Sequence, residues 1–128
     1  DFKGLPKQQI DMLATKLEER SQQQVENAMQ DVWARLYKAM HHIYDRLSSP
    51  DKTFHNTMTT NVQELARLLK HLNVTTNLDI EKIRLYLDKF VTPHDADTLR
   101  KNPTLRTVTA AHVKNVLDKM GKIAGGPA

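Results

Sequence analysis

The chain has 128 residues, of which 39% are hydrophobic and 27% are charged, and it carries a formal net charge of +4 with a pI near 9.4. This length and composition predict one soluble globular domain with a modest core, and they exclude an intrinsically disordered chain. No apolar run approaches the roughly 20 residues of a membrane-spanning helix, and the absence of cysteine excludes disulfides, thiolate zinc sites and cysteine nucleophiles.

The first predicted element is one long helix over residues 6–47. Apolar residues recur there every three or four positions, and neither Gly nor Pro interrupts the pattern before Pro50. Such a helix is about 60 Å long at roughly 1.5 Å per residue, so part of it must project from a domain of this size or lie along a partner. The polar residues 18–24 divide it into two packing units. We therefore expect a projecting arm over residues 1–24 and a helical core over residues 25–121, followed by a tail over residues 122–128.

The second predicted helix begins at Pro50, with Ser49 as its N-cap, and forms an antiparallel hairpin with the first. Its apolar positions keep helical spacing through Leu72. The residues expected to pack between the two helices are Trp33, Leu36, Met40, Phe54, Val62, Leu65 and Leu69.

Three shorter helices are predicted in the remainder of the chain. The third covers about residues 78–91, with Thr76 or Asn77 as its N-cap. The dipeptides Thr92-Pro93 and Asn102-Pro103 then predict a short helix to Lys101 and a last helix that ends at Gly121. No segment has the alternating pattern of a strand. The predicted fold is all-α, a bundle of about five helices that begins with a long N-terminal helix.

Residues with catalytic or metal-binding chemistry do not form a recognisable pattern. His41 and His42 are adjacent, so on a helix they point about 100° apart and cannot bind one metal together. The neighbouring carboxylates at Asp79 and Glu81, like those at Asp95 and Asp97, lie at helix starts, where acidic side chains are expected for electrostatic reasons alone. The sequence therefore predicts no enzyme activity, no catalytic residue, no metal site and no cofactor.

Basic residues concentrate in the C-terminal half, where Arg100, Lys101 and Arg106 surround the start of the last helix. A helix N-terminus with nearby arginines can hold a phosphate group, which makes these three residues candidates for contact with nucleic acid. Acidic residues are interleaved with these bases. A solvated surface of balanced charge is the alternative interpretation.

A series of short motifs in the last two thirds of the chain carries a resemblance to a known group. Leu68-Leu69, Leu72-Asn73-Val74-Thr75, Leu99-Arg100, Pro103 and Leu105-Arg106 follow a pattern of the form LL-x-x-LN-(I/V)-T and LR-x-x-P-x-(L/V)-R. This pattern resembles helical proteins of unknown function from bacteriophages and integrative mobile elements. The resemblance implies a phage or mobile-element origin, and it supplies no reaction. The expected location is cytoplasmic, which the absence of cysteine fits. Since Asp1 stands where an initiator Met would be, we expect a fragment of a longer polypeptide.

Two classes of function follow. The first is a non-enzymatic helical interaction or assembly module. Its arm would pair with a protein partner through Ile10, Leu13 and Leu17, and we expect a homodimer or higher assembly joined through residues 7–24, because the short later helices must already cover the hairpin. The alternative is a nucleic-acid-binding accessory protein that uses Arg100, Lys101 and Arg106. In that case the affinity of the protein for nucleic acid falls steeply as the salt concentration rises.

Overall fold

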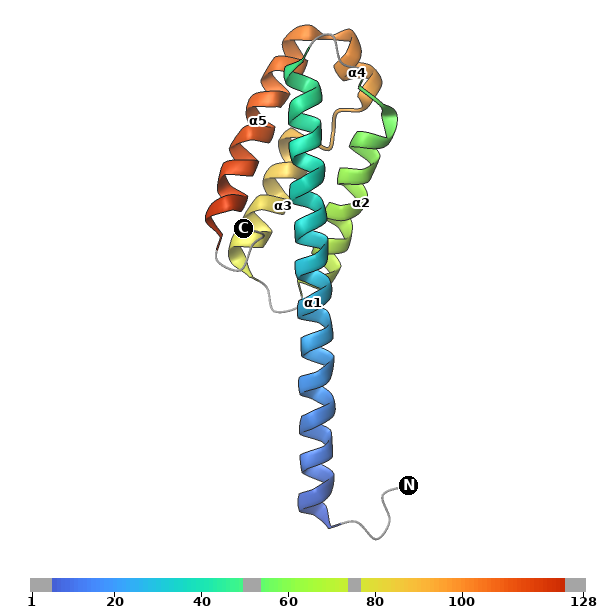
Figure 1. Ribbon diagram of the computed structural model, residues 1–128, viewed down its shortest axis with the longest axis vertical. Coiled ribbons are helices and arrows are strands. Elements are labelled where there is room, and N and C mark those ends of the chain that lie inside the picture. Colours follow the sequence, from blue (N-terminus) through green and yellow to red (C-terminus); the bar gives the residue numbers. More distant parts are fainter. Residues whose placement is uncertain (1–5, 50–53, 74–76, 124–128) are drawn as a thin grey trace.

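The computed structural model describes residues 6–49, 54–73 and 77–123, and within these ranges the protein is all-helical, as predicted (Figure 1). The helices, in chain order, are α1 (Lys7–Ser48), α2 (Asn56–Leu72), α3 (Leu78–Phe90), α4 (Ala96–Lys101) and α5 (Pro103–Lys122).

Helix α1 runs without a break for 42 residues, which confirms the prediction of one long N-terminal helix. Pro6 occupies the N-cap, where its missing N–H leaves no hydrogen bond unmade. Only the C-terminal half of α1 is buried, and its fully buried residues are Val32, Trp33, Leu36, Met40, Ile43 and Leu47. The N-terminal half projects from the bundle (Figure 1).

Helices α1, α2, α3 and α5 form the bundle. Helix α1 packs on α2 and α5, and α3 packs on the same two helices from the other side. Helices α1 and α3 run in one direction while α2 and α5 run in the other, and α4 lies across the end opposite the arm (Figure 1). All seven residues predicted to pack between α1 and α2 are buried, with Leu36, Met40 and Leu69 fully enclosed. Each side chain of this size contributes roughly 1.5 to 3 kcal/mol through burial.

Two of the three predicted helix starts are displaced. Helix α2 begins at Asn56, with His55 as its N-cap, and Pro50 lies outside the described residues. Phe54 precedes the helix because its ring is buried in the core while its carbonyl accepts a hydrogen bond from Arg100 Nη1 at 2.7 Å.

Helix α4 begins at Ala96, not at Pro93. Residues 91–94 form a turn instead, in which Thr92 N–H donates to Leu87 O at 2.9 Å and Thr92 O accepts from Gln63 Nε2 at 2.8 Å. Asp95 is consequently the N-cap, and its carboxylate accepts from Thr98 N–H at 2.8 Å.

The other predicted boundaries agree closely with the structure. Asn77 caps α3 through its side-chain oxygen, which accepts from the N–H groups of Asp79 and Ile80. Asn102 caps α5 by accepting from Leu105 N–H at 3.0 Å, and Pro103 stands at the first helical position. Gly121 lies inside α5, which ends at Lys122.

Candidate functional site

The arm, residues 7–24 of α1, exposes its apolar side chains to solvent. Every residue of this segment except the half-buried Ile10 is exposed. Leu13 and Leu17 expose 45% and 59% of their surface, and Met12 exposes 54%. The structure thus brings the three predicted contact residues Ile10, Leu13 and Leu17 onto one projecting helix, where no part of the bundle covers them (Figure 1).

The apolar stripe of the arm meets one edge of the face of α1 that enters the bundle. At about 100° per residue, Ile10, Leu17, Ala28 and Val32 fall within roughly a quarter turn of one another. Ala28 is half-buried and Val32 is buried. The fully enclosed Leu36 lies about 80° farther round the helix than Ile10, so the arm stripe is offset from the centre of the core-forming face.

Charged side chains of both signs surround the arm stripe. Viewed from the N-terminus, Lys16, Arg20 and Glu19 lie anticlockwise of the leucines, while Lys7, Glu18 and Asp11 lie clockwise of them. Neither side of the stripe carries charge of one sign alone.

The three basic candidates do not act as one cluster. Arg106 binds the C-terminal end of α1, where its guanidinium donates to the carbonyl oxygens of Leu47 at 3.2 Å and Ser49 at 3.1 Å, and also to that of Arg46. Because the C-terminus of a helix carries partial negative charge, this cation stabilises the end of α1.

Arg100 joins α4 to the start of α2, since it donates to Phe54 O at 2.7 Å and to Asn56 Oδ1 at 3.0 Å. Lys101 forms an exposed ion pair with Asp97 at 3.0 Å, and Arg100 also pairs with this carboxylate, at 3.4 Å. Arg100 and Arg106 line an open groove of about 620 Å³ between the end of α1 and the start of α5. Their hydrogen bonds to backbone carbonyls give Arg100 and Arg106 a structural role, which neither interpretation of the sequence included.

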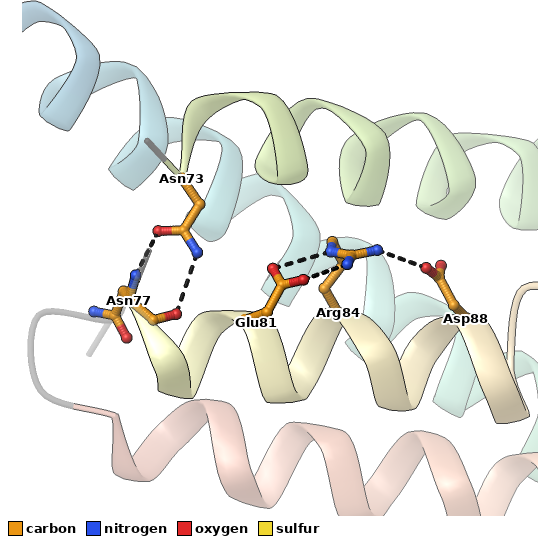
Figure 2. Close-up of polar contacts among 5 residues, drawn as sticks. All are labelled: Asn73, Asn77, Glu81, Arg84 and Asp88. Atoms are coloured by element: carbon orange, nitrogen blue, oxygen red, sulfur yellow. Dashed lines mark hydrogen bonds and ion pairs between the residues drawn. The ribbon is translucent and has the colours of Figure 1, made fainter. Parts of the chain in front are cut away.

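An ion-pair network around the buried Arg84 of α3 was missed in the sequence (Figure 2). Arg84 is 9% exposed and pairs with Glu81 one turn before it and with Asp88 one turn after it, the latter at 2.8 Å. The hydrogen bond from Arg84 lowers the pKa of the Glu81 carboxyl, and the same contact raises the pKa of Arg84. The i, i+3 and i, i+4 spacing of these residues was the available signal.

Polar side chains also join α3 to α2 and to α5. The side chain of Asn73 exchanges two hydrogen bonds with the backbone of Asn77, at 2.9 and 3.2 Å, and so joins the end of α2 to the start of α3 (Figure 2). Between α3 and α5, Tyr86 Oη and His112 Nδ1 share a hydrogen bond of 2.8 Å, and the Phe90 ring stacks on His112. This contact gives His112 a packing role.

The described part of the chain holds no group of three histidine or acidic side chains arranged to bind a metal ion. Among the same residues, no helix has the length and apolar character needed to cross a lipid bilayer. Comparisons with protein-family models, curated proteins and solved structures found no match. The resemblance to helical phage and mobile-element proteins therefore remains a prediction.

Proposed function

We propose that this protein is a non-enzymatic helical assembly module that associates with a second copy of itself through the arm. The observation that supports this proposal is the exposure of Leu13, Leu17 and Met12 on a helix that projects from its own bundle. The phage or mobile-element origin belongs to the same proposal, which requires no metal or cofactor.

The energetics of the arm favour a partner. Burying a leucine fully contributes roughly 1.5 to 3 kcal/mol, and Leu13 and Leu17, which share one side of the helix, therefore provide a substantial driving force. The arm is the part of α1 that its own bundle does not pack against, and most helical stability in proteins comes from packing of an apolar face. A partner helix on the arm would supply this packing.

Sedimentation velocity and light scattering at micromolar concentration test the proposal. We expect the full chain to self-associate, and we expect both the truncated chain of residues 25–128 and the double variant Leu13→Ser/Leu17→Ser to be monomeric. Val108→Ser is a matched control, because Val108 is an exposed apolar residue of α5 outside the arm. A full chain that remains monomeric up to about 100 μM, where specific assemblies of at least moderate affinity are populated, contradicts the proposal.

A further inference from the structure

The groove between the end of α1 and the start of α5 has an apolar floor. It encloses about 620 Å³, and it lies at the end of the bundle opposite the arm (Figure 1). Its α5 wall carries two consecutive alanines, Ala110 and Ala111, and its α1 wall carries Tyr44 and Leu47. An alanine side chain ends at Cβ, so a hollow remains where a larger side chain would fill the space between the two helices.

Three cations line the same groove, and none of the described residues that line it is acidic. Arg100 of α4 and Arg106 of α5 lie near the start of α5, while Lys114 lies farther along that helix. The positions of Arg106 and Lys114 are about 12 Å apart along the helix axis, at roughly 1.5 Å per residue. Side chains of a helix lean toward its N-terminus, so the Lys114 side chain leans toward the two alanines. The apolar floor therefore has positive charge at both ends.

Lys114 is the cation of the groove that the fold does not use. Arg100 and Arg106 hold backbone carbonyl oxygens, as described above, and Arg100 also shares the Asp97 carboxylate with Lys101. Lys114 is exposed, and within the described residues it forms no hydrogen bond or ion pair. Its ammonium group is thus available to an anion that enters the groove.

We propose that this groove binds a small amphiphilic anion, a molecule with a compact apolar body and one phosphate or carboxylate group. The apolar body lies over Ala110, Ala111 and Tyr44, and the anionic group is held by Lys114. The volume of the groove falls within the range of about 300 to 1,000 Å³ that is usual for small-molecule sites. The site is separate from the arm, so this inference does not depend on self-association.

The shape of the groove favours this ligand over a bare phosphate ion or a nucleic acid. A bare phosphate leaves the apolar floor in water, and its attraction to an exposed lysine is weakened by the solvent. A nucleic-acid backbone carries closely spaced charges, which proteins match with several neighbouring lysines and arginines. Here the cations stand at the two ends of an apolar floor, an arrangement that an amphiphile matches with both of its parts.

Binding of naphthyl phosphate, followed by amide chemical shifts in NMR titration, tests the inference. Naphthol provides the apolar body alone, and inorganic phosphate provides the anion alone. We expect naphthyl phosphate to bind more tightly than either, with shifts at Tyr44, Ala110, Ala111 and Lys114. The inference is wrong if these amides do not respond to naphthyl phosphate, or if inorganic phosphate or naphthol binds there as tightly.

Two substitutions at exposed positions locate the site. Ala111→Trp fills the groove and should abolish binding, and Lys114→Glu should weaken it about fivefold or more, because it replaces an attraction by a repulsion. Lys82→Glu is the matched control, since Lys82 is an exposed lysine of α3 that does not line the groove. Circular dichroism verifies that the variants remain folded. Equal affinities of the Lys114→Glu and Lys82→Glu variants would overturn the assignment of Lys114.

The arm variant separates this inference from the proposed function. We expect Leu13→Ser/Leu17→Ser to bind naphthyl phosphate as the wild type does, because the two substitutions lie on the projecting arm. Loss of binding in this folded variant would place the ligand on the arm and contradict the groove as its site.

Discussion

Arg106 shows how one side chain that resembled a ligand-binding residue can serve the fold. Its guanidinium donates to carbonyl oxygens at the end of α1 from a position 57 to 60 residues away in sequence. Replacement by Ala leaves these carbonyls without their charged donor. Since hydrogen bonds to charged groups contribute about 1.5 to 3 kcal/mol each, we expect Arg106→Ala to lower the free energy of unfolding by at least about 1.5 kcal/mol in urea denaturation.

Lys101→Ala is the matched control for Arg106, because its side chain is 76% exposed and its ion pair with Asp97 is solvated. We expect the urea midpoint of this variant to equal that of the wild type. Equal losses at both positions would argue against a specific role of Arg106 at the end of α1.

Two leucines on α2, one buried and one exposed, show how much burial contributes to stability when the residue type is the same. Leu65 is 7% exposed and faces α1, while Leu68 is 49% exposed on the same helix. Leu65→Ala leaves a cavity in the core and should cost about 2 to 5 kcal/mol of unfolding free energy. Leu68→Ala should change it by less than about 0.5 kcal/mol. Similar losses in thermal or chemical denaturation of the two variants would contradict the packing of α1 against α2.

The Glu81 carboxyl contributes to the dependence of the protein's stability on pH. Its pKa is lowered in the folded state by Arg84, so its contribution to stability is present above the ordinary glutamate value of about 4.3 and is lost as the pH falls through the lower folded value. We expect Glu81→Gln to be less stable than the wild type at pH 7 and the difference to shrink between about pH 4 and pH 2. Denaturation midpoints across this range measure it, and a constant difference would contradict the assignment.

At the level of the helices, the capping residues explain which boundaries the sequence could predict. Asn77 and Asn102 cap α3 and α5 through their own side chains, and local sequence is enough to recognise them. Helix α2 begins at Asn56 and α4 at Ala96, later than the prolines indicated, and next to these starts Arg100 binds Phe54 and Gln63 binds the turn at Thr92, contacts that join distant parts of the chain. A proline suits a turn and a first helical position equally well, so only these tertiary contacts decide between the two.

The contribution of a helix cap to stability can be tested at Asn102, the N-cap of α5. Its side-chain oxygen accepts from Leu105 N–H, and Asn102→Ala removes this partner. We expect a loss of about 0.5 to 2 kcal/mol in the free energy of unfolding, and we expect Asn102→Asp to keep most of the stability, because aspartate caps a helix equally well. An Asp variant as unstable as the Ala variant would show that the cap is not the interaction lost.

For the whole molecule, the length of α1 was the informative feature of the sequence. A helix of 42 residues is longer than its own bundle, and the exposed stripe at Leu13 and Leu17 follows from that excess. The exposure of Leu78 and Leu85 on α3 was not predicted. Periodicity ranks the faces of a helix by hydrophobicity, but it cannot show which exposed leucines remain uncovered once α2 and α5 are packed.

Self-association also makes the stability of the molecule depend on its concentration. Any species that binds only the folded state raises the melting temperature by mass action, and a second copy does so increasingly as the protein is concentrated. We expect the melting temperature of the full chain to rise between about 1 and 100 μM, a range that spans the micromolar affinities of moderate interactions. The chain of residues 25–128 retains every fully buried residue of α1, beginning with Val32, so it should melt cooperatively at one temperature throughout this range. A rise of equal size in both chains would place the association outside the arm.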